Sequence, residues 1–417
     1  MSKLIAAISQ AAAIRLRQRL QPEGGAGDKL FPPTFADPKP KKESDKKGVY
    51  SFEVRRLDGE SVPCVLLDSV ASQANRLEQV VADAVATGLA LPELRVDFAS
   101  NFPEIGEISV LSAPHRVFDA IFRDSVVDGK AFSKSSLYIS LAAANIRNAN
   151  AIFVNSPSAL LFGCWDSAGA AGGLGNKFPR VITSELIGVN ASIGETRGGV
   201  RNCPLSIVST ATAQIHKKAT KTEKALDWSL ASKATDMETL KPSEINHGNI
   251  LVGTELTSRD LIDSNGKIEI EFSKQGGVTA DYALQISVIS INALKRLRFP
   301  EALGAASPTR DAAAQRVLLA LGLLALTLGR EQGYWLRSRC GLVAEGYADF
   351  EVVYGDGRIE SFKLTAAEAR IEFDSAVTAA KAAGLGWNGV QMLTPQPKLV
   401  ELIKKSRELQ ALGKVES

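Results

Sequence analysis

A strongly apolar stretch, residues 317–328, lies between Arg316 and Arg330 and sets the first limit on the fold. A helix that spans a membrane needs about 20 apolar residues, so this shorter stretch predicts a helix buried in a protein core. Ser307 and Pro308 precede it and are typical of a helix start. The chain has 417 residues, of which 45% are hydrophobic and 23% charged, so it can bury a large core without disulfides or a structural metal.

Strand and helix patterns alternate along the rest of the chain, and their interleaving predicts a mixed α+β fold. One example is the helix expected over residues 70–84, which begins at Asp68 or Ser69 and has Gln73 and Glu78 on its polar side. The expected strands are residues 64–67, 94–98, 151–154, 159–162, 267–272, 350–354 and 358–362. Four more helices are expected. One lies at the N-terminus around Lys3, Arg15 and Arg17, and one begins at Pro114. A third runs from the capping box of Thr365 and Glu368 to about Gly384, and a basic one covers residues 398–412.

Two segments interrupt these patterns and suggest how the chain is organised. Residues 21–49 are rich in Gly, Pro and Lys, so residues 1–49 are predicted to be an N-terminal helix and a basic linker arm ahead of a main body over residues 50–417. From residue 166 to about residue 246 the periodic patterns give way to Gly, Ser, Thr and Lys, which predicts a long irregular insertion.

Cysteine and histidine usage argues against several classes of enzyme. The four cysteines are scattered without zinc-ligand spacing, which predicts buried thiols in a reducing, cytoplasmic protein; they are Cys64, Cys164, Cys203 and Cys340. His115, His216 and His247 lie far apart and form no metal motif or catalytic triad, and the GxSxG pattern of serine hydrolases is absent from the sequence. A metalloenzyme or a serine-histidine triad is therefore poorly supported, and we predict no metal and no cofactor.

The glycine-rich string over residues 172–178, which reads GGLGNKF, is the nearest approach to a phosphate-binding loop. A nucleotide-hydrolysing loop needs Lys directly after Gly and then Ser or Thr for magnesium. Here Asn176 intervenes before Lys177, and Phe178 stands in place of the hydroxyl. The string therefore favours a simple turn or a loop beside a phosphodiester backbone over a nucleotide site.

Two other groups of basic residues could bind phosphate. Arg116 and Arg123 lie near a predicted helix start, although Arg123 could equally pair with Asp119 on a solvated face. If residues 335–340 are extended, Arg337 and Arg339 share one face, where they could hold a nucleic-acid backbone beside Tyr334 as a stacking ring; the alternative is pairing with acidic neighbours.

The formal net charge of +3 hides an uneven distribution. Residues 176–224 alone carry +5, so the remainder of the chain sums to −2. A basic excursion of this kind is one way in which proteins bind phosphates. The candidate nucleic-acid contacts are His115, Arg116, Arg123, Gly172, Gly173, Gly175, Asn176, Lys177, Arg180, Arg197, Arg201, Lys217, Lys218, Arg337 and Arg339.

Taken in order, several strings resemble a known family over roughly residues 30–385. Together they are similar to the Csb-one proteins, the Cas-seven backbone subunits of type I-G (formerly I-U) CRISPR effector complexes. The strings are LFPPT at 30–34, LLDS at 66–69, SQANRLE at 72–78, APHR at 113–116, DS at 124–125, SPSALLFG at 156–163, WDS at 165–167, GGLGNKF at 172–178 and LRSRC at 336–340.

This resemblance implies a RAMP-superfamily fold, in which a modified RRM-like (ferredoxin-like) palm carries large thumb and finger insertions. The implied role is non-catalytic: copies of the chain stack along one CRISPR RNA and present it for pairing with target DNA. The implied partners are Cas-five-like and Cas-six-like subunits and a large subunit, with no membrane. The aromatic motif that RRM domains use for stacking is not visible here, so stacking of that kind is not expected. A RAMP-type endoribonuclease that processes CRISPR RNA is the main alternative, and a small-molecule enzyme is a weaker one.

Overall fold

An interior strand of the main sheet in the computed structural model is β1 (Ala11–Pro22), which comes from the N-terminal end of the chain. The structure describes residues 10–36, 48–166, 177–194, 200–201, 250–251 and 276–411. In β1, the buried side chains of Ile14, Leu16 and Leu20 recur at every second or fourth position, the spacing of a strand with one buried face. The prediction of an N-terminal helix around Arg15 and Arg17 is therefore wrong for β1, and Lys3 lies outside the described residues.

The main sheet has the strand order β18-β19-β1-β17-β12-β5-β4, with β20 paired to β1 and β21 to β20. Every ladder in it is antiparallel, and the helices between its strands confirm the α+β prediction. Its other strands are β4 (Phe52–Leu57), β5 (Glu60–Asp68), β12 (Ile182–Val189), β17 (Tyr282–Ser290), β18 (Tyr334–Arg337), β19 (Cys340–Ala344), β20 (Phe350–Tyr354) and β21 (Ile359–Phe362).

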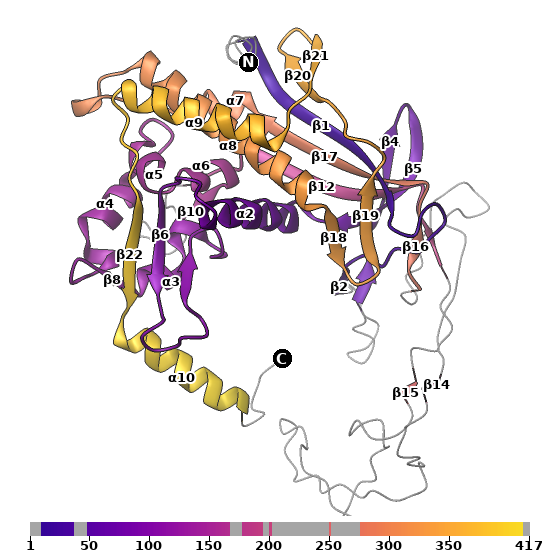
Figure 1. The fold of residues 1–417 in the computed structure, drawn as a ribbon, viewed down its shortest axis with the longest axis horizontal. Coiled ribbons are helices and arrows are strands. Elements are labelled where there is room, and N and C mark those ends of the chain that lie inside the picture. Colours follow the sequence, from indigo (N-terminus) through magenta and orange to yellow (C-terminus); the bar gives the residue numbers. More distant parts are fainter. Residues whose placement is uncertain are drawn as a thin grey trace, which may run out of the picture. The chain divides into compact units, whose positions relative to one another are not determined.

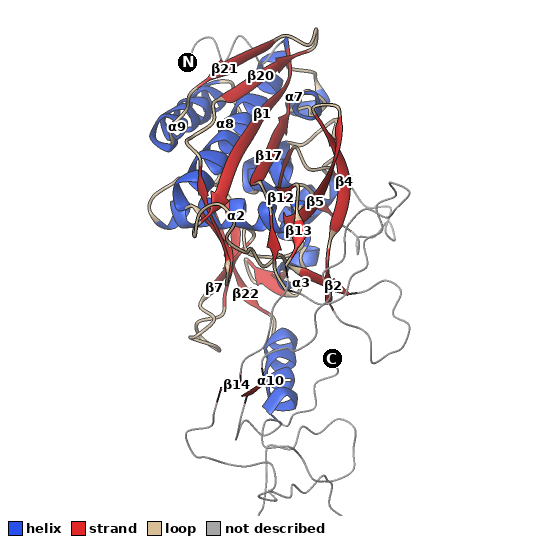
Figure 2. Ribbon diagram, turned by 90° about the vertical axis from the view of Figure 1, so that its right-hand side faces the viewer, coloured by secondary structure: helices blue, strands red, loops and turns tan. Residues whose placement is uncertain are grey.

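Three long helices cover one face of this sheet: α2 (Val70–Ala86), α8 (Pro308–Gln332) and α9 (Ala366–Ala382) (Figure 1). Helix α8 is the predicted core helix. It is long and apolar enough to cross a membrane, but 72% of its most apolar window is buried inside the protein, as a core helix requires. Gly322 allows this close packing, because a Cβ there would lie 2.9 Å from the side chain of Ile289 in β17. Figure 2 shows the opposite face, with β1, β17 and β12 in front of α8.

A smaller sheet has the order β7-β6-β22-β8-β9 and lies in the same unit as the main sheet. Its strands are β6 (Glu93–Asp97), β7 (Glu107–Ser109), β8 (Ser125–Val127), β9 (Lys130–Ala131) and β22 (Val390–Pro395). Short helices accompany it: η2 (Arg116–Phe118), α3 (Ala120–Arg123), η3 (Phe132–Lys134), α4 (Ser136–Ala143), α5 (Asn150–Asn155) and α6 (Pro157–Phe162), followed later in the chain by α7 (Ile291–Leu294) and η5 (Ala302–Gly304).

Helices α5 and α6 correct the prediction of two paired strands over residues 151–154 and 159–162. These runs are short and almost wholly buried, and periodicity cannot separate a buried strand from a buried helical turn in such a run. Pro157 occupies the first turn of α6, a position that favours a helix.

Most other predicted elements are confirmed. Ser69 caps α2, residues 93–97 form β6, and β20 with β21 makes the predicted hairpin. Thr365 and Glu368 form the predicted capping box of α9. The helix expected from Pro114 is instead divided into η2 and α3, because Asp119 is extended and its side chain caps α3.

The chain divides into two units, residues 1–192 with 278–396 and residues 193–277 with 397–417. In the second unit the structure describes α10 (Pro397–Ala411), which confirms the predicted C-terminal helix, and the pair β14 (Val200–Arg201) and β15 (Ile250–Leu251). Residues 182–189 correct the predicted insertion, because they form β12 within the main sheet. The predicted strand over 267–272 lies outside the described residues. The remaining short strands are β2 (Thr34–Ala36), β3 (Gly48–Tyr50), β10 (Cys164–Trp165), β11 (Lys177–Phe178), β13 (Ser192–Ile193) and β16 (Val278–Thr279).

Candidate nucleic-acid interface

The face of the main sheet that lies opposite α2, α8 and α9 carries a row of three arginines, which belong to β1. Arg15, Arg17 and Arg19 alternate along β1 with side chains that are buried on the helix side. The register places Arg15 opposite Val288 and Arg17 opposite Ile286 on β17. Because paired residues of two strands share a face, this face combines guanidinium groups with apolar side chains. We call Arg15, Arg17 and Arg19 the arginine stripe.

The three arginines of the stripe differ in what they contact. Arg15 pairs with Glu351 of β20 at 2.5 Å, and Arg19 pairs with Glu345 at 3.1 Å while lying 3.8 Å over the ring of Tyr282. The Arg17 side chain is exposed and makes no hydrogen bond or ion pair with any residue in the described part of the chain. Its guanidinium group is therefore available to an external anion.

Sequence reasoning missed the arginine stripe although the signal was present. Residues 14–20 read IRLRQRL, and a charge at every second position is the two-residue period of a strand with one solvated face. The prediction for these residues is instead an amphipathic helix. Read as a strand, they would have placed three arginines side by side on one face of a sheet.

Arg116, a predicted phosphate contact, is instead committed to the protein interior. Its Nε lies 2.5 Å from Oε1 of Glu78, and it donates a hydrogen bond of 3.0 Å to the carbonyl of Gly163. Only 11% of the Arg116 side chain and 4% of the Glu78 side chain are exposed. Burial raises the pKa of Glu78, while the hydrogen bond from Arg116 lowers it. Arg116 thus compensates a buried carboxylate, and its neighbour His115 is exposed.

Arg123 forms an exposed ion pair, the alternative left open by the sequence, but its partner is not the expected Asp119. It pairs with Asp124 at 3.0 Å, and this hydrogen bond raises the pKa of Arg123. Asp119, the partner expected from helical spacing, instead accepts hydrogen bonds from the backbone N–H groups of His115 and Ile121.

The shared face predicted for Arg337 and Arg339 is wrong, because the chain turns between β18 and β19. Arg337 pairs in register with Cys340, and Arg339 has a φ of 56° within the turn. Arg337 donates a hydrogen bond of 2.9 Å to the carbonyl of Leu67, and the Arg339 guanidinium lies 4.5 Å over the ring of Phe31.

Tyr334, the predicted stacking ring, is also unavailable. It is buried, and its hydroxyl donates a hydrogen bond of 3.1 Å to Gln285. Burial raises the pKa of the Tyr334 phenol, which keeps it a hydrogen-bond donor.

Lys177 and Arg180 are exposed and stay candidate contacts. The Lys177 ammonium lies 5.6 Å over the ring of Trp165, across the pair of short strands β10 and β11. For Arg201 the structure describes only the backbone, in β14. The other predicted contacts lie outside the described residues; they are Gly172, Gly173, Gly175, Asn176, Arg197, Lys217 and Lys218.

A buried polar network joins α2 to the sheet and holds β18 in place. Asp68, at the end of β5, accepts hydrogen bonds from Gln73 at 2.6 Å and Arg76 at 2.9 Å, and it pairs with Arg337 at 3.3 Å. Arg76 also donates to the backbone carbonyls of Trp335 and Leu336. The prediction that Gln73 and Glu78 lie on the polar side of α2 is wrong, because both are buried with partners.

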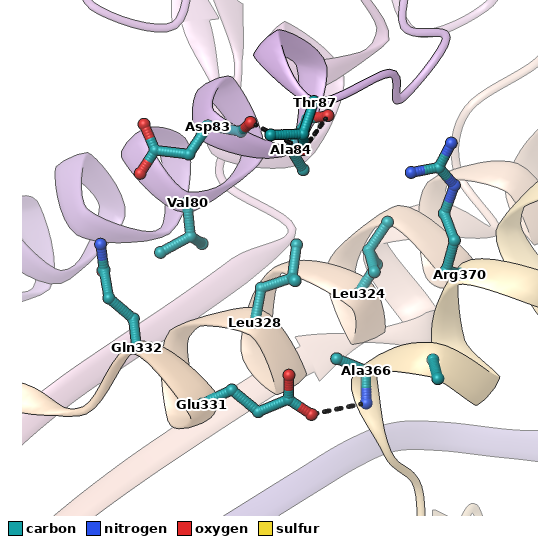
Figure 3. A pocket seen from close by; sticks show the side chains of 11 residues that line it. Val80, Asp83, Ala84, Thr87, Leu324, Leu328, Glu331, Gln332, Ala366 and Arg370 are labelled. Atoms are coloured by element: carbon teal, nitrogen blue, oxygen red, sulfur yellow. Dashed lines mark hydrogen bonds between the residues drawn. The ribbon is translucent and has the colours of Figure 1, made fainter.

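A groove of about 490 Å³ lies on the helix side, between α2, α8 and α9 (Figure 3). Its floor includes the apolar side chains of Leu324 and Leu328. Two charged groups that line it are already engaged: Glu331 accepts from the Ala366 backbone N–H, and Arg370 pairs with Asp374. We assign no ligand to this groove.

The cysteines behave as the sequence predicts where the structure describes them. Cys64, Cys164 and Cys340 are buried and free, and burial raises the pKa of each thiol, to about 12 for Cys164. Cys203 lies outside the described residues. Among the described residues no group of three or more His, Cys, Asp or Glu side chains could hold a metal ion.

Comparison with known proteins gives a family match and similarity to solved structures. Residues 14–193 match the family described as CRISPR-associated protein GSU0053. Among solved structures, the chain is similar to Csc2 from Thermofilum pendens at 11% sequence identity with a TM-score of 0.25; the alignment covers 99% of this chain and 80% of that chain. No curated protein matches the chain.

Proposed function

Since residues 14–193 match a family of CRISPR-associated proteins, as the sequence resemblance predicted, we propose that the chain is a guide-RNA-binding backbone subunit of a type I CRISPR effector complex. In this proposal it is non-catalytic and cytoplasmic, and several copies lie along one CRISPR RNA. The guide then pairs with target DNA, while Cas-five-like, Cas-six-like and large subunits complete the assembly.

The chain order of the main-sheet elements supports the proposed RRM-like palm. Strands β20, β1, β17 and β12 are adjacent in that order, and α2 lies between β1 and β12 along the chain while α8 lies between β17 and β20. A ferredoxin-like βαββαβ unit has this arrangement, with its fourth, first, third and second strands side by side. Strands β5 and β4 extend such a palm beyond β12, while β19 pairs with the C-terminal end of β1, past the residues of β1 that pair with β20.

The arginine stripe is the observation that carries the RNA-binding part of the proposal. Guanidinium groups bind phosphate oxygens through paired N–H donors, and phosphate contacts supply most of the affinity of proteins that do not read bases. Arg17 has no partner among the described residues, and Arg15 and Arg19 keep partly exposed side chains beside it. The stripe lies on the sheet face away from α2, α8 and α9, where an extended strand of RNA can reach its exposed and partly exposed side chains.

Salt-dependent RNA binding tests the proposal. Fluorescence anisotropy would measure the affinity of the purified chain for single-stranded RNA at several salt concentrations. We expect Arg17→Gln to weaken binding and to reduce the slope of log K against log [salt] by about 0.7 per lost phosphate contact. Arg123→Gln is the matched control, since Arg123 is exposed but pairs with Asp124, and it should leave the slope unchanged. Failure of the unmodified chain to bind RNA, alone and with partner subunits, would refute the proposal.

The non-catalytic and oligomeric parts of the proposal need their own measurements. Incubation with repeat-containing RNA should give no cleavage product, and specific cleavage would favour the endoribonuclease alternative. Size-exclusion chromatography with absorbance at 260 and 280 nm reports assembly and bound RNA together. We expect a multi-copy species whose absorbance ratio indicates nucleic acid.

A further inference from the structure

Trp335 is the most exposed aromatic side chain on the main sheet, with 66% of its surface accessible. It lies in β18, directly opposite Gly341 of β19, whereas its neighbours Tyr334 and Leu336 are buried on the helix side. Val343 shares the outer face with Gly341 and pairs with Gln21 of β1. Trp335 therefore lies on the same sheet face as the arginine stripe.

The Trp335 ring has no partner within the described part of the chain. It makes no aromatic, cation–π or side-chain hydrogen-bond contact there, unlike Trp387, which packs against Phe153 and Phe373. A tryptophan ring left in water gives up the favourable burial of a large apolar surface. Such a ring on an open sheet face is typical of a binding site.

The backbone beneath Trp335 is fixed before any ligand arrives. Arg76 donates hydrogen bonds of 3.3 Å to the carbonyl of Trp335 and 2.7 Å to that of Leu336, and Arg337 is held by Leu67 and Asp68. These contacts tie β18 to α2 and β5 through long-range partners. A ring on a fixed backbone loses little conformational freedom on binding, so it suits a flat ligand.

The charge next to Trp335 selects among ligands. The Glu23 carboxylate lies over Gly341, since a Cβ on Gly341 would fall 2.2 Å from its Cδ. Glu23 is exposed and has no ion-pair partner among the described residues. A carboxylate repels phosphate but can accept hydrogen bonds from the amino group of a base. The arginines lie further along β1, with Arg19 roughly 13 Å from Glu23 at 3.3 Å per residue.

From this arrangement we infer that Trp335 is a base-stacking platform for single-stranded RNA whose phosphates lie on the arginine stripe. The inference rests on the proposed RNA-binding function and adds a site to it. Aromatic rings stack on any base, which gives affinity without sequence preference. The chain lacks the aromatic motif of RRM domains, and Trp335 supplies a ring from an outer strand instead.

Stacking and phosphate contact predict different variant behaviour. Trp335→Ala should weaken binding to single-stranded RNA about 5-fold to 100-fold without changing the salt slope, because stacking releases no counterions. The Trp335→Ala variant and the unmodified chain should bind an abasic ribose-phosphate oligomer of the same length with equal affinity, because that oligomer has no bases to stack. Trp335→Phe should restore most of the loss, since a smaller ring still stacks. Val343→Ala, which removes an exposed apolar side chain of the same face, is the matched control and should have no effect.

Each other outcome overturns the inference in a distinguishable way. Unchanged RNA affinity in Trp335→Ala, together with a reduced slope in Arg17→Gln, would refute stacking and leave the proposed function standing. If Trp335→Ala disrupts assembly of copies in sedimentation velocity while RNA affinity of the single chain is unchanged, the ring is a protein contact. If the unmodified chain shows no RNA affinity, both the proposed function and this inference fail.

Discussion

Replacement of Arg116 by Met tests the buried ion pair that holds η2 against α2. Methionine keeps an unbranched apolar stem but lacks the guanidinium group, so it leaves the Glu78 carboxylate without its partner. Removing one member of a buried ion pair costs about 3–5 kcal/mol of unfolding free energy, because the remaining charge is desolvated. The low exposure of both side chains places this pair in that class, and the lost hydrogen bond to the Gly163 carbonyl adds to the cost.

The cost of Arg116→Met should also depend on pH in a defined direction. Burial raises the pKa of Glu78 above its ordinary value near 4.3, and without Arg116 it rises further. A carboxyl group whose pKa is higher in the folded chain loses stabilising effect as pH rises through that folded value. The destabilisation should therefore be larger at pH 7 than at pH 5, where more of the Glu78 carboxyl is protonated in the variant.

Urea unfolding followed by tryptophan fluorescence at the two pH values measures this effect. Arg123→Met is the matched control, because its ion pair with Asp124 is exposed and should contribute at most about 1 kcal/mol. The double variant Glu78→Gln with Arg116→Met should recover part of the loss, since no buried charge remains. Equal costs for Arg116→Met and Arg123→Met, or a cost that does not change with pH, would refute the reasoning.

Two further predictions concern a helix cap and the thiols. Thr365→Ala should destabilise the chain by about 1 kcal/mol because it removes the capping box of α9, whereas Thr378→Ala, on an exposed position of the same helix, should cost less in the same urea assay. Iodoacetamide at pH 8 should leave Cys64, Cys164 and Cys340 unmodified in the folded chain, because burial raises the pKa of each thiol, and it should label all three in urea. Mass spectrometry of peptides would measure the labelling. Rapid labelling of Cys164 in the folded chain would contradict its burial.

The sequence predicted the elements whose signals are local. The apolar run of α8, the capping box of Thr365 and the hairpin of β20 and β21 each depend on neighbouring residues, and the structure confirms all three. The prediction for β1 is wrong because three apolar residues among arginines, Ile14, Leu16 and Leu20, fit a helix as easily as a strand until the partner strands are known. Strand β12 was missed because a glycine-rich stretch precedes it and the partners it pairs with are distant in sequence.

The candidate site was harder to predict, because charge in the sequence does not reveal which charges are already paired. Arg116 and Arg337 look like phosphate contacts, but Glu78 lies 38 positions from Arg116 and Asp68 lies 269 positions from Arg337. Only the fold brings these partners together. Arg17 was passed over for the opposite reason: nothing in the sequence marks it as the arginine of β1 that the described fold leaves unpaired.

The hydrogen bonds from Arg76 to β18 have a consequence for how the molecule avoids unwanted association. β18 ends the strand order of the main sheet, and an edge strand with free backbone groups invites another chain to add to it. Here the carbonyls of Trp335 and Leu336 already accept hydrogen bonds from a side chain of α2. The guanidinium group thus blunts this edge against β-strand addition and aggregation, while the Trp335 ring remains in solvent.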